Sequence, residues 1–287
     1  MTTILVTGAT GNVGRTVVAE LLARGVGVWA FVRDERRAHE LLGPDVRLVA
    51  GDFTVTASLR RAMSDVDAVF LTSADGPAKV EHECAVIDAA SAAWVPRIVK
   101  LSSLHVEAGS DLGFWDWHAR IEEHLRGSGV PWVMLRANFL MSNLLAAANA
   151  VEATGQLFVP AGDAKIAMID PRDVGASAAA LLTGDGHEGR TYTVTGGEAI
   201  TYADVAAQLS AATRRPVRFV DVPGDAAREA LLSSGAPEWL ADNLVRLFGK
   251  LRDGAGASVT DTVRELTGRA PRTFVEWARD HAAAFGG

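Results

Sequence analysis

The 287-residue sequence has little of two things, cysteine and long apolar stretches. Its one cysteine, Cys84, excludes an intramolecular disulfide and suits a reducing compartment. Cys84 lies in a predicted helix over residues 80–93, where it is interpreted as a small buried hydrophobe rather than a nucleophile. No segment approaches the roughly 20 apolar residues of a membrane span, and the N-terminus shows no signal-peptide pattern. These absences predict a cytoplasmic protein without a membrane partner.

Two further absences concern charge and metal ligands. The formal net charge is -7 and no run of Lys and Arg forms a basic stripe, which argues against nucleic acid as the main partner. The seven histidines show no recurring ligand spacing, so no structural metal is predicted. A small molecule is the expected partner, bound by a monomer or homodimer.

The most informative pattern that is present lies in the first fourteen residues. Ile4–Val6 is typical of a short buried strand, and three glycines then punctuate a turn into a helix predicted over residues 15–23. In a dinucleotide-binding turn the first glycine permits the tight turn, the second lets the backbone approach the pyrophosphate, and the third lets helix and strand pack closely. The free N–H groups at the helix start face the anion. The residues assigned to this cofactor site are Gly8, Thr10, Gly11, Asn12, Val13 and Gly14.

Apolar runs alternate with helical patterns through the first half, which predicts an α/β fold with a doubly wound, parallel Rossmann sheet. The predicted strands are residues 4–7, 28–32, 47–50, 68–71, 98–101 and 132–136, and the predicted helices are 15–23, 38–42, 57–63, 80–93 and 118–126. Residues 1–155 form the expected dinucleotide-binding domain, which a strand near 190–196 rejoins. Residues 156–287 form an interleaved, smaller and mostly helical substrate-binding region.

That second region has its own local signals. A helical stretch is expected over 140–154 and a short strand over 166–169. Asp170 and Pro171 are typical of a helix start. From residue 201 the chain is predicted to be mostly helical, and residues 254–258 are predicted to form a flexible loop.

Arg33 indicates which dinucleotide binds. It follows the second strand, about 20 residues past the glycine turn, where an NAD-preferring site places an acid. A guanidinium there can pair with a 2′-phosphate through forked, charge-assisted hydrogen bonds, which favours NADP over NAD. The alternative is a solvated charged turn, because Asp34 and Glu35 are interleaved with arginines.

The carboxyl ends of the third and fourth strands should also face the cofactor. Asp52 can accept a hydrogen bond from the adenine amine and Phe53 can cover the ring; the alternative is a plain turn with an N-cap role for Asp52 or Thr54. Thr72, Ser73 and Ala74 are expected over the middle of the cofactor.

Together these segments resemble the NmrA-like group of atypical short-chain dehydrogenases. The resemblance rests on Thr7–Gly14, Gly51-Asp52, Lys100-Leu-Ser-Ser103 and Ser128–Arg136, and it extends over nearly the whole chain. It implies that Leu101 and the segment containing Asn138 and Phe139 run along the cofactor.

The wider superfamily reduces carbonyls with a Ser and a Tyr-x-x-x-Lys pair, and the resemblance places Phe114 at the Tyr position and His118 at the Lys position. Phe114 cannot donate a proton. With an ordinary pKa near 6.5, His118 can, and NmrA-like quinone reductases resemble this chain in having His-x-x-x-Glu here. The alternative for His118 is ribose binding or helix orientation.

Other candidate groups lie near the same position. Ser102 and Ser103 are candidates to touch the nicotinamide or the substrate oxygen, or they are turn serines. His105 is either a pocket acid or a surface residue. The predicted substrate pocket comprises His105, Phe114, Trp115, Asn143, Met168 and Trp239.

Loss of the tyrosine favours electrophiles whose reduced oxygen is stabilised by resonance. The first hypothesis is therefore an NADPH-dependent reductase of a quinone, enone or polycyclic aromatic ketone. The alternatives are a redox sensor that binds dinucleotide without turnover, and an isomerase or cyclase that keeps the fold as a scaffold.

Overall fold

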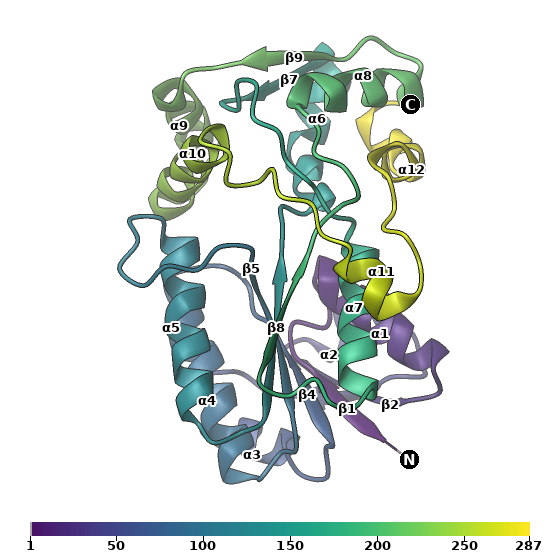
Figure 1. Ribbon diagram of the computed structural model, residues 1–287, viewed down its shortest axis with the longest axis vertical. Helices are drawn as coiled ribbons and strands as arrows, with labels where there is room; N and C mark the ends of the chain where they lie inside the picture. The colour runs from purple at the N-terminus through teal and green to yellow at the C-terminus, as the bar shows by residue number, and fades with distance from the viewer. Residues whose placement is uncertain (1) are drawn as a thin grey trace.

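A seven-stranded sheet, parallel throughout, forms the centre of the molecule (Figure 1). The structure is a computed structural model and describes residues 2–287. The strand order is β3-β2-β1-β4-β5-β6-β8. The strands are β1 (Thr3–Val6), β2 (Gly27–Val32), β3 (Arg47–Ala50), β4 (Ala68–Leu71), β5 (Ile98–Ser103), β6 (Trp132–Ala137) and β8 (Arg190–Val194). This order contains the 3-2-1-4-5-6 arrangement of dinucleotide-binding folds, so the predicted fold class is confirmed.

Helices cover both faces of this sheet (Figure 1). One face carries α1 (Asn12–Ala23), α2 (Glu35–Leu42), α7 (Pro171–Thr183) and α11 (Thr262–Thr267), and the other carries α3 (Thr56–Ala62), α4 (Lys79–Ala92) and α5 (Gly113–Gly127). Ile4 and Val6 pack into one core and Leu5 into the other, all of them fully buried. A strand buried on both faces reads as a continuous apolar run, which explains why the sequence predicts it.

A smaller lobe lies beyond the carboxyl ends of these strands (Figure 1). It contains a parallel two-stranded sheet of β7 (Gln156–Val159) and β9 (Arg218–Asp221). Its helices are η1 (Met141–Ala147), α6 (Ala148–Thr154), α8 (Tyr202–Thr213), α9 (Gly224–Ser233), α10 (Glu238–Arg252), α12 (Phe274–Asp280) and η2 (Ala282–Phe285). Tyr202, Phe274 and Trp277 lie at the centre of its core.

Several local predictions need correction. The strand expected over 166–169 is reduced to two isolated bridges, one between Ile166 and Ile200 and one between Leu140 and Ile169. The strands β7 and β9 were not predicted. The helical stretch predicted over 140–154 is present as the 3-10 turns of η1 followed by α6, whereas α5 begins at Gly113 instead of residue 118. The predicted start of α7 is confirmed, because the Asp170 carboxylate accepts from the Arg172 N–H at 2.8 Å.

The chain passes between the two lobes more than once. After β7 it returns to the large sheet as α7, which packs on α1, and as β8, which pairs with β6. It then re-enters the small lobe at α8. The domain boundary at residue 155 stays a prediction, and segments that follow it contribute to both lobes.

In residues 2–287, no helix combines the length and apolar character that crossing a bilayer requires. In the same range, no group of three or more His, Cys, Asp or Glu side chains is arranged to hold a metal ion. Cys84 is half-buried rather than buried. Burial and the nearby carboxylates of Asp88 and Glu83 raise the pKa of its thiol to about 11.

Candidate active site

The glycine turn has three different steric requirements. Gly8 has a φ of +57°, and a Cβ built there lies 2.8 Å from Cγ2 of Thr72. A Cβ at Gly14 lies only 2.1 Å from the Gly8 carbonyl oxygen. A Cβ at Gly11 meets nothing nearer than that same oxygen at 3.2 Å. The turn therefore requires Gly8 and Gly14 for its own geometry, whereas Gly11 leaves open space toward the cavity that it lines.

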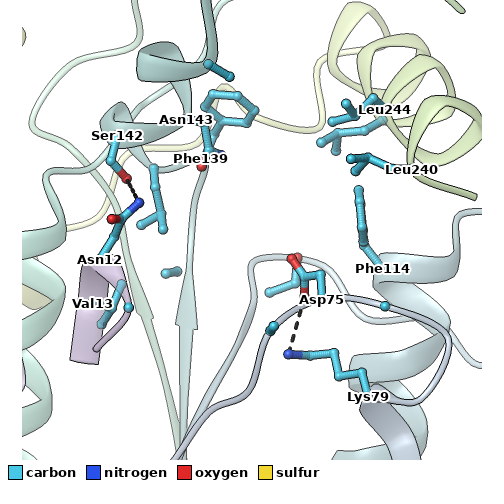
Figure 2. A pocket seen from close by; sticks show the side chains of 18 of the residues that line it. Asn12, Val13, Asp75, Lys79, Phe114, Phe139, Ser142, Asn143, Leu240 and Leu244 are labelled. Atoms are coloured by element: carbon cyan, nitrogen blue, oxygen red, sulfur yellow. Dashed lines mark hydrogen bonds and ion pairs between the residues drawn. The ribbon is translucent and has the colours of Figure 1, made fainter. Parts of the chain in front are cut away.

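The helix that follows begins without a side-chain cap. Gly11 is the N-cap residue of α1, and no side chain accepts a hydrogen bond from the first-turn N–H groups. Asn12 is turned aside, because its Nδ2 donates to Oγ of Ser142 at 3.3 Å (Figure 2). Unsatisfied N–H groups at the positive end of a helix bind anions. The turn and helix together fit the pyrophosphate of a dinucleotide.

One cavity of about 1670 Å³ begins at this turn and continues between the two lobes. Every predicted cofactor residue lines it: Gly8, Thr10, Gly11, Asn12, Val13, Gly14, Arg33, Asp52, Phe53, Thr72, Ser73, Ala74, Leu101, Asn138 and Phe139. The candidates His105, Phe114, Trp115, His118, Asn143 and Trp239 line it too, as do Ser102 and Ser103. Met168 does not, and its assignment to the pocket was wrong. Its side chain is 2% exposed and packs in the core of the small lobe, where an apolar side chain is most stable.

Arg33 lies at the end of β2, exposed and at the rim of the cavity. It makes no ion pair with any residue in the range 2–287, whereas Asp34 is already used to cap α2 by accepting from the Arg37 N–H at 3.0 Å. The guanidinium is therefore available to a ligand phosphate.

Asp52 stabilises the turn after β3, which was the alternative to a role in binding adenine. Its Oδ1 accepts from the N–H and hydroxyl of Thr54 at 2.8 and 2.7 Å, and these hydrogen bonds lower its pKa. Phe53 packs between Phe31 and His82, with ring centroids 5.5 and 5.6 Å away. Both residues line the cavity, so adenine contact stays a prediction.

The two serines at the end of β5 differ. The Ser102 hydroxyl is buried and donates to Oε1 of Glu122 at 2.7 Å. Although burial raises the pKa of Glu122, hydrogen bonds from Arg136 and Ser102 lower it below its ordinary value. Ser102 thus stabilises a buried carboxylate instead of facing a substrate. Ser103 is half-buried, and its hydroxyl has no partner in the described range. It remains the candidate.

His105 and Asn138 both hold the loop over residues 254–258. A ring nitrogen of His105 lies 2.7 Å from the Ala255 carbonyl oxygen, and Nδ2 of Asn138 donates to that of Gly256 at 2.9 Å. The Asn138 Oδ1 accepts from the Phe139 N–H at 2.7 Å. The pocket-acid interpretation of His105 is therefore not supported, and the loop is anchored rather than flexible. Asn143 is exposed with no side-chain hydrogen bond in residues 2–287, so its amide is available to a ligand.

His118 lies beside buried charge. Its Nδ1 is 3.2 Å from Nζ of Lys100, a fully buried lysine. Burial and the charges of Lys100 and Lys79 lower the pKa of His118 well below 6.5. The expectation of an imidazole titrating near neutrality is corrected: His118 is neutral at pH 7.

Lys100 belongs to a cluster that the sequence did not reveal. Its Nζ lies 2.7 Å from Oε2 of Glu83, and Nζ of Lys79 lies 2.9 Å from Oε1 of the same carboxylate. Ser73 also donates to Glu83, at 2.9 Å. Burial raises the pKa of Glu83, but the charges of Lys100 and Lys79 outweigh it and lower that pKa to about 2. Asp75 at the cavity edge contacts Lys79 at 3.3 Å (Figure 2).

Comparison with known proteins identifies relatives of this chain. The chain is 44% identical over 283 residues to a (4-alkanoyl-5-oxo-2,5-dihydrofuran-3-yl)methyl phosphate reductase of Streptomyces griseus subsp. griseus, covering 98% of this chain and 99% of the relative. It is 38% identical over 283 residues to an NAD(P)H azoreductase of Xenophilus azovorans, covering 99% of each. The structure of the NADPH-dependent quinone oxidoreductase of Escherichia coli complexed with NADPH superposes with a TM-score of 0.88. It is 31% identical and covers 96% of this chain and 99% of that one. The model of the NmrA-like family matches residues 1–278, and the chain belongs to that family.

Proposed function

We propose that the protein is an NADPH-dependent reductase that transfers hydride to a quinone, an enone or a polycyclic aromatic ketone. The observation that carries the proposal is the single cavity that joins the glycine turn to an apolar chamber. Its volume of about 1670 Å³ exceeds the roughly 300–1,000 Å³ of a typical small-ligand site, as expected where two molecules bind side by side. The reductases and quinone oxidoreductase named above support the assignment.

At the cofactor end, the uncapped start of α1 would bind the pyrophosphate and Arg33 would bind the 2′-phosphate. A dinucleotide held there would supply the hydride. Around the acceptor, Ser103 at the end of β5 and Asn143 on η1 offer hydrogen bonds, and His118 of α5 offers another. These groups orient the acceptor's oxygen and stabilise the charge that develops on it.

At the substrate end, the lining is apolar. Phe114 of α5 points toward Leu240 and Leu244 of α10, and all three line the cavity (Figure 2). No residue of α9 is buried in a core, but Ala227, Ala230 and Leu231 line the cavity. An amphipathic helix that turns this face to a cavity shelters an apolar ligand. Because no tyrosine occupies position 114, substrates with a delocalised product oxyanion suit the site.

The test is NADPH oxidation followed by absorbance against quinones, enones and polycyclic aromatic ketones, with NADPH affinity measured separately. Turnover of at least one class supports the proposal. Tight NADPH binding without turnover across the panel instead indicates a redox sensor. A product isomerised without net NADPH oxidation indicates the scaffold role.

Arg33→Ala is expected to raise KM for NADPH about tenfold and to leave KM for NADH within about twofold. A hydrogen bond to a charged group contributes about 1.5–3 kcal/mol. NADH has no 2′-phosphate, so it makes no such bond with Arg33 and loses none in the variant. Steady-state kinetics with both cofactors measures the ratio. The control is Arg36→Ala, exposed on α2 and outside the cavity lining. An equal increase in KM for NADPH and for NADH contradicts the assignment of Arg33 to the 2′-phosphate.

Ala227→Trp is expected to raise KM about tenfold for an acceptor with a bulky apolar substituent and to leave a small benzoquinone unaffected. The indole fills the chamber, and overpacking costs about 1–3 kcal/mol. KM values for a series of increasingly substituted quinones test this. Glu229→Trp, on the exposed part of α9 outside the cavity lining, is the matched control. An unchanged size dependence argues that the substituent lies elsewhere.

The proposal extends to the setting of the enzyme. We place it in the cytoplasm, acting on a small molecule without nucleic acid, as a monomer or homodimer. The single thiol of Cys84 suits a reducing compartment.

A further inference from the structure

The ammonium of Lys100 is enclosed by three groups that can accept from it. Oε2 of Glu83 lies 2.7 Å from Nζ and Nδ1 of His118 lies 3.2 Å away, and the third acceptor is the Leu101 carbonyl oxygen. The Lys100 side chain is 0% exposed, so water does not reach it. An ammonium has three N–H donors and no acceptor. Its protons match two hydrogen-bond acceptors, the Leu101 carbonyl oxygen and Nδ1 of His118, while Oε2 of Glu83 holds the ammonium as an ion pair.

This match determines which ring nitrogen of His118 carries the proton. A nitrogen that accepts from an ammonium has its lone pair free, so Nδ1 is unprotonated and the proton lies on Nε2. In residues 2–287, Nε2 has no hydrogen-bond partner, and it is not among the sealed, unpartnered buried atoms. Since His118 lines the cavity, its Nε2–H donor is available there.

We propose that Lys100, held in place by Glu83, is a positioning residue that keeps His118 neutral and directs its Nε2–H toward the substrate oxygen. The catalytic part of this inference rests on the proposed reductase function. A neutral imidazole can polarise a carbonyl by donating a hydrogen bond, and it needs no proton from solvent to do so. The arrangement makes the site's donor independent of pH across the neutral range.

The charges around His118 act in the same direction. Lys100 on β5, Lys79 on α4 and Arg136 on β6 all disfavour a protonated ring, and burial adds to them. The carboxylate of Glu83 is shared by the two lysines. The carboxylate of Glu122, one turn after His118 on α5, is held by Ser102, Arg126 and Arg136. Neither acid is left to stabilise an imidazolium.

Nitrogen-15 NMR of histidine-labelled protein tests the tautomer directly, without substrate. In the wild type, His118 is expected to show a protonated Nε2 and an unprotonated Nδ1, with no titration near the ordinary imidazole value of about 6.5. A proton on Nδ1, or a midpoint at or above about 6.5, overturns the proposal. Because this measurement needs no variant, it decides the matter even if a substitution at Lys100 prevents folding.

Lys100→Met supplies the second arm. Without the ammonium, the nearest charge that disfavours a protonated ring is gone, so the pKa of His118, and with it the titration midpoint, is expected to rise toward its ordinary value. The kcat profile, level in the wild type, is then expected to bend at the same midpoint. Lys165→Met, at an exposed lysine, should change neither readout. A His118 signal and a kcat profile that are both unchanged in Lys100→Met overturn the positioning role.

The two proposals fail separately. If the panel shows no turnover but His118 has the expected tautomer and responds to Lys100→Met, the reductase assignment fails and the control of His118 by Lys100 stands. If the panel shows turnover but His118 titrates near pH 6.5 in the wild type, the reductase assignment stands and the role of Lys100 is wrong.

Discussion

Replacing His118 by phenylalanine is expected to lower kcat for a conjugated ketone about 100-fold while changing KM for NADPH little. Removing one positioned hydrogen-bond donor to a developing oxyanion costs about 10²–10³-fold in kcat, and phenylalanine fills the space without donating. The loss for a quinone should be smaller, because its reduced oxygen is stabilised by the ring. Steady-state kinetics on both acceptors measures the difference.

His105→Phe is the matched control, since it removes another histidine that lines the cavity. Its imidazole contacts the Ala255 carbonyl oxygen, so the substitution should loosen the loop over 254–258 and affect substrate KM before kcat. If His118→Phe retains wild-type kcat on every acceptor, His118 is not the donor. If His105→Phe instead loses kcat about 100-fold, the catalytic roles of the two histidines are reversed.

Gly14→Ala is expected to lower the free energy of unfolding by about 3 kcal/mol. The added methyl group would lie 2.1 Å from the Gly8 carbonyl oxygen and 2.9 Å from Cα of Ala9. Both neighbours are backbone, so relief requires α1 to move away from the turn, and overpacking or backbone strain of this kind costs about 1–3 kcal/mol. Urea unfolding followed by circular dichroism gives the value.

Two other glycines make the result specific. Gly127→Ala adds a methyl group at the end of α5 with nothing within 4 Å, and its stability should be unchanged or slightly higher. Gly11→Ala should remain nearly as stable as the wild type but bind NADPH more weakly, because its methyl group enters the space for the pyrophosphate. Wild-type stability in Gly14→Ala would contradict this, because it would show that the turn can accommodate a methyl group at position 14.

The large sheet could be predicted because its signals are local and redundant. Ile4–Val6 is apolar at every position, as a strand buried on both faces must be, and glycines follow it at once. The N-cap of α7 was predictable for the same reason: Asp170 and Pro171 determine the helix start without tertiary contacts.

The small lobe was harder because its elements are short. β7 and β9 have four residues each and are stabilised only by pairing with one another, which no local window reveals. Residues 166–169 have the apolar pattern of a strand, but their neighbours offer only isolated bridges. Met168 has the same apolar character in a core as in a pocket, so its type alone could not assign it.

In the candidate site, residue types were predicted better than their charge state. Lys79 and Glu83 are spaced as an ordinary solvated helix pair, and only packing shows that both are buried beside Lys100. The low pKa of His118 follows from that burial, so it could not be read from the sequence.

The parallel pairing of β6 with β8 has a consequence for how the chain folds while it is being synthesised. β6 ends at Ala137 and β8 spans Arg190–Val194, so residues 138–194 must leave the ribosome before the outer edge of β6 is fully paired. Until then a nascent chain displays an unpaired row of N–H and C=O groups, which other chains can pair with. During synthesis, the incomplete sheet is therefore prone to aggregate through the exposed edge of β6. Rapid elongation or a chaperone at that stage increases the yield of folded protein.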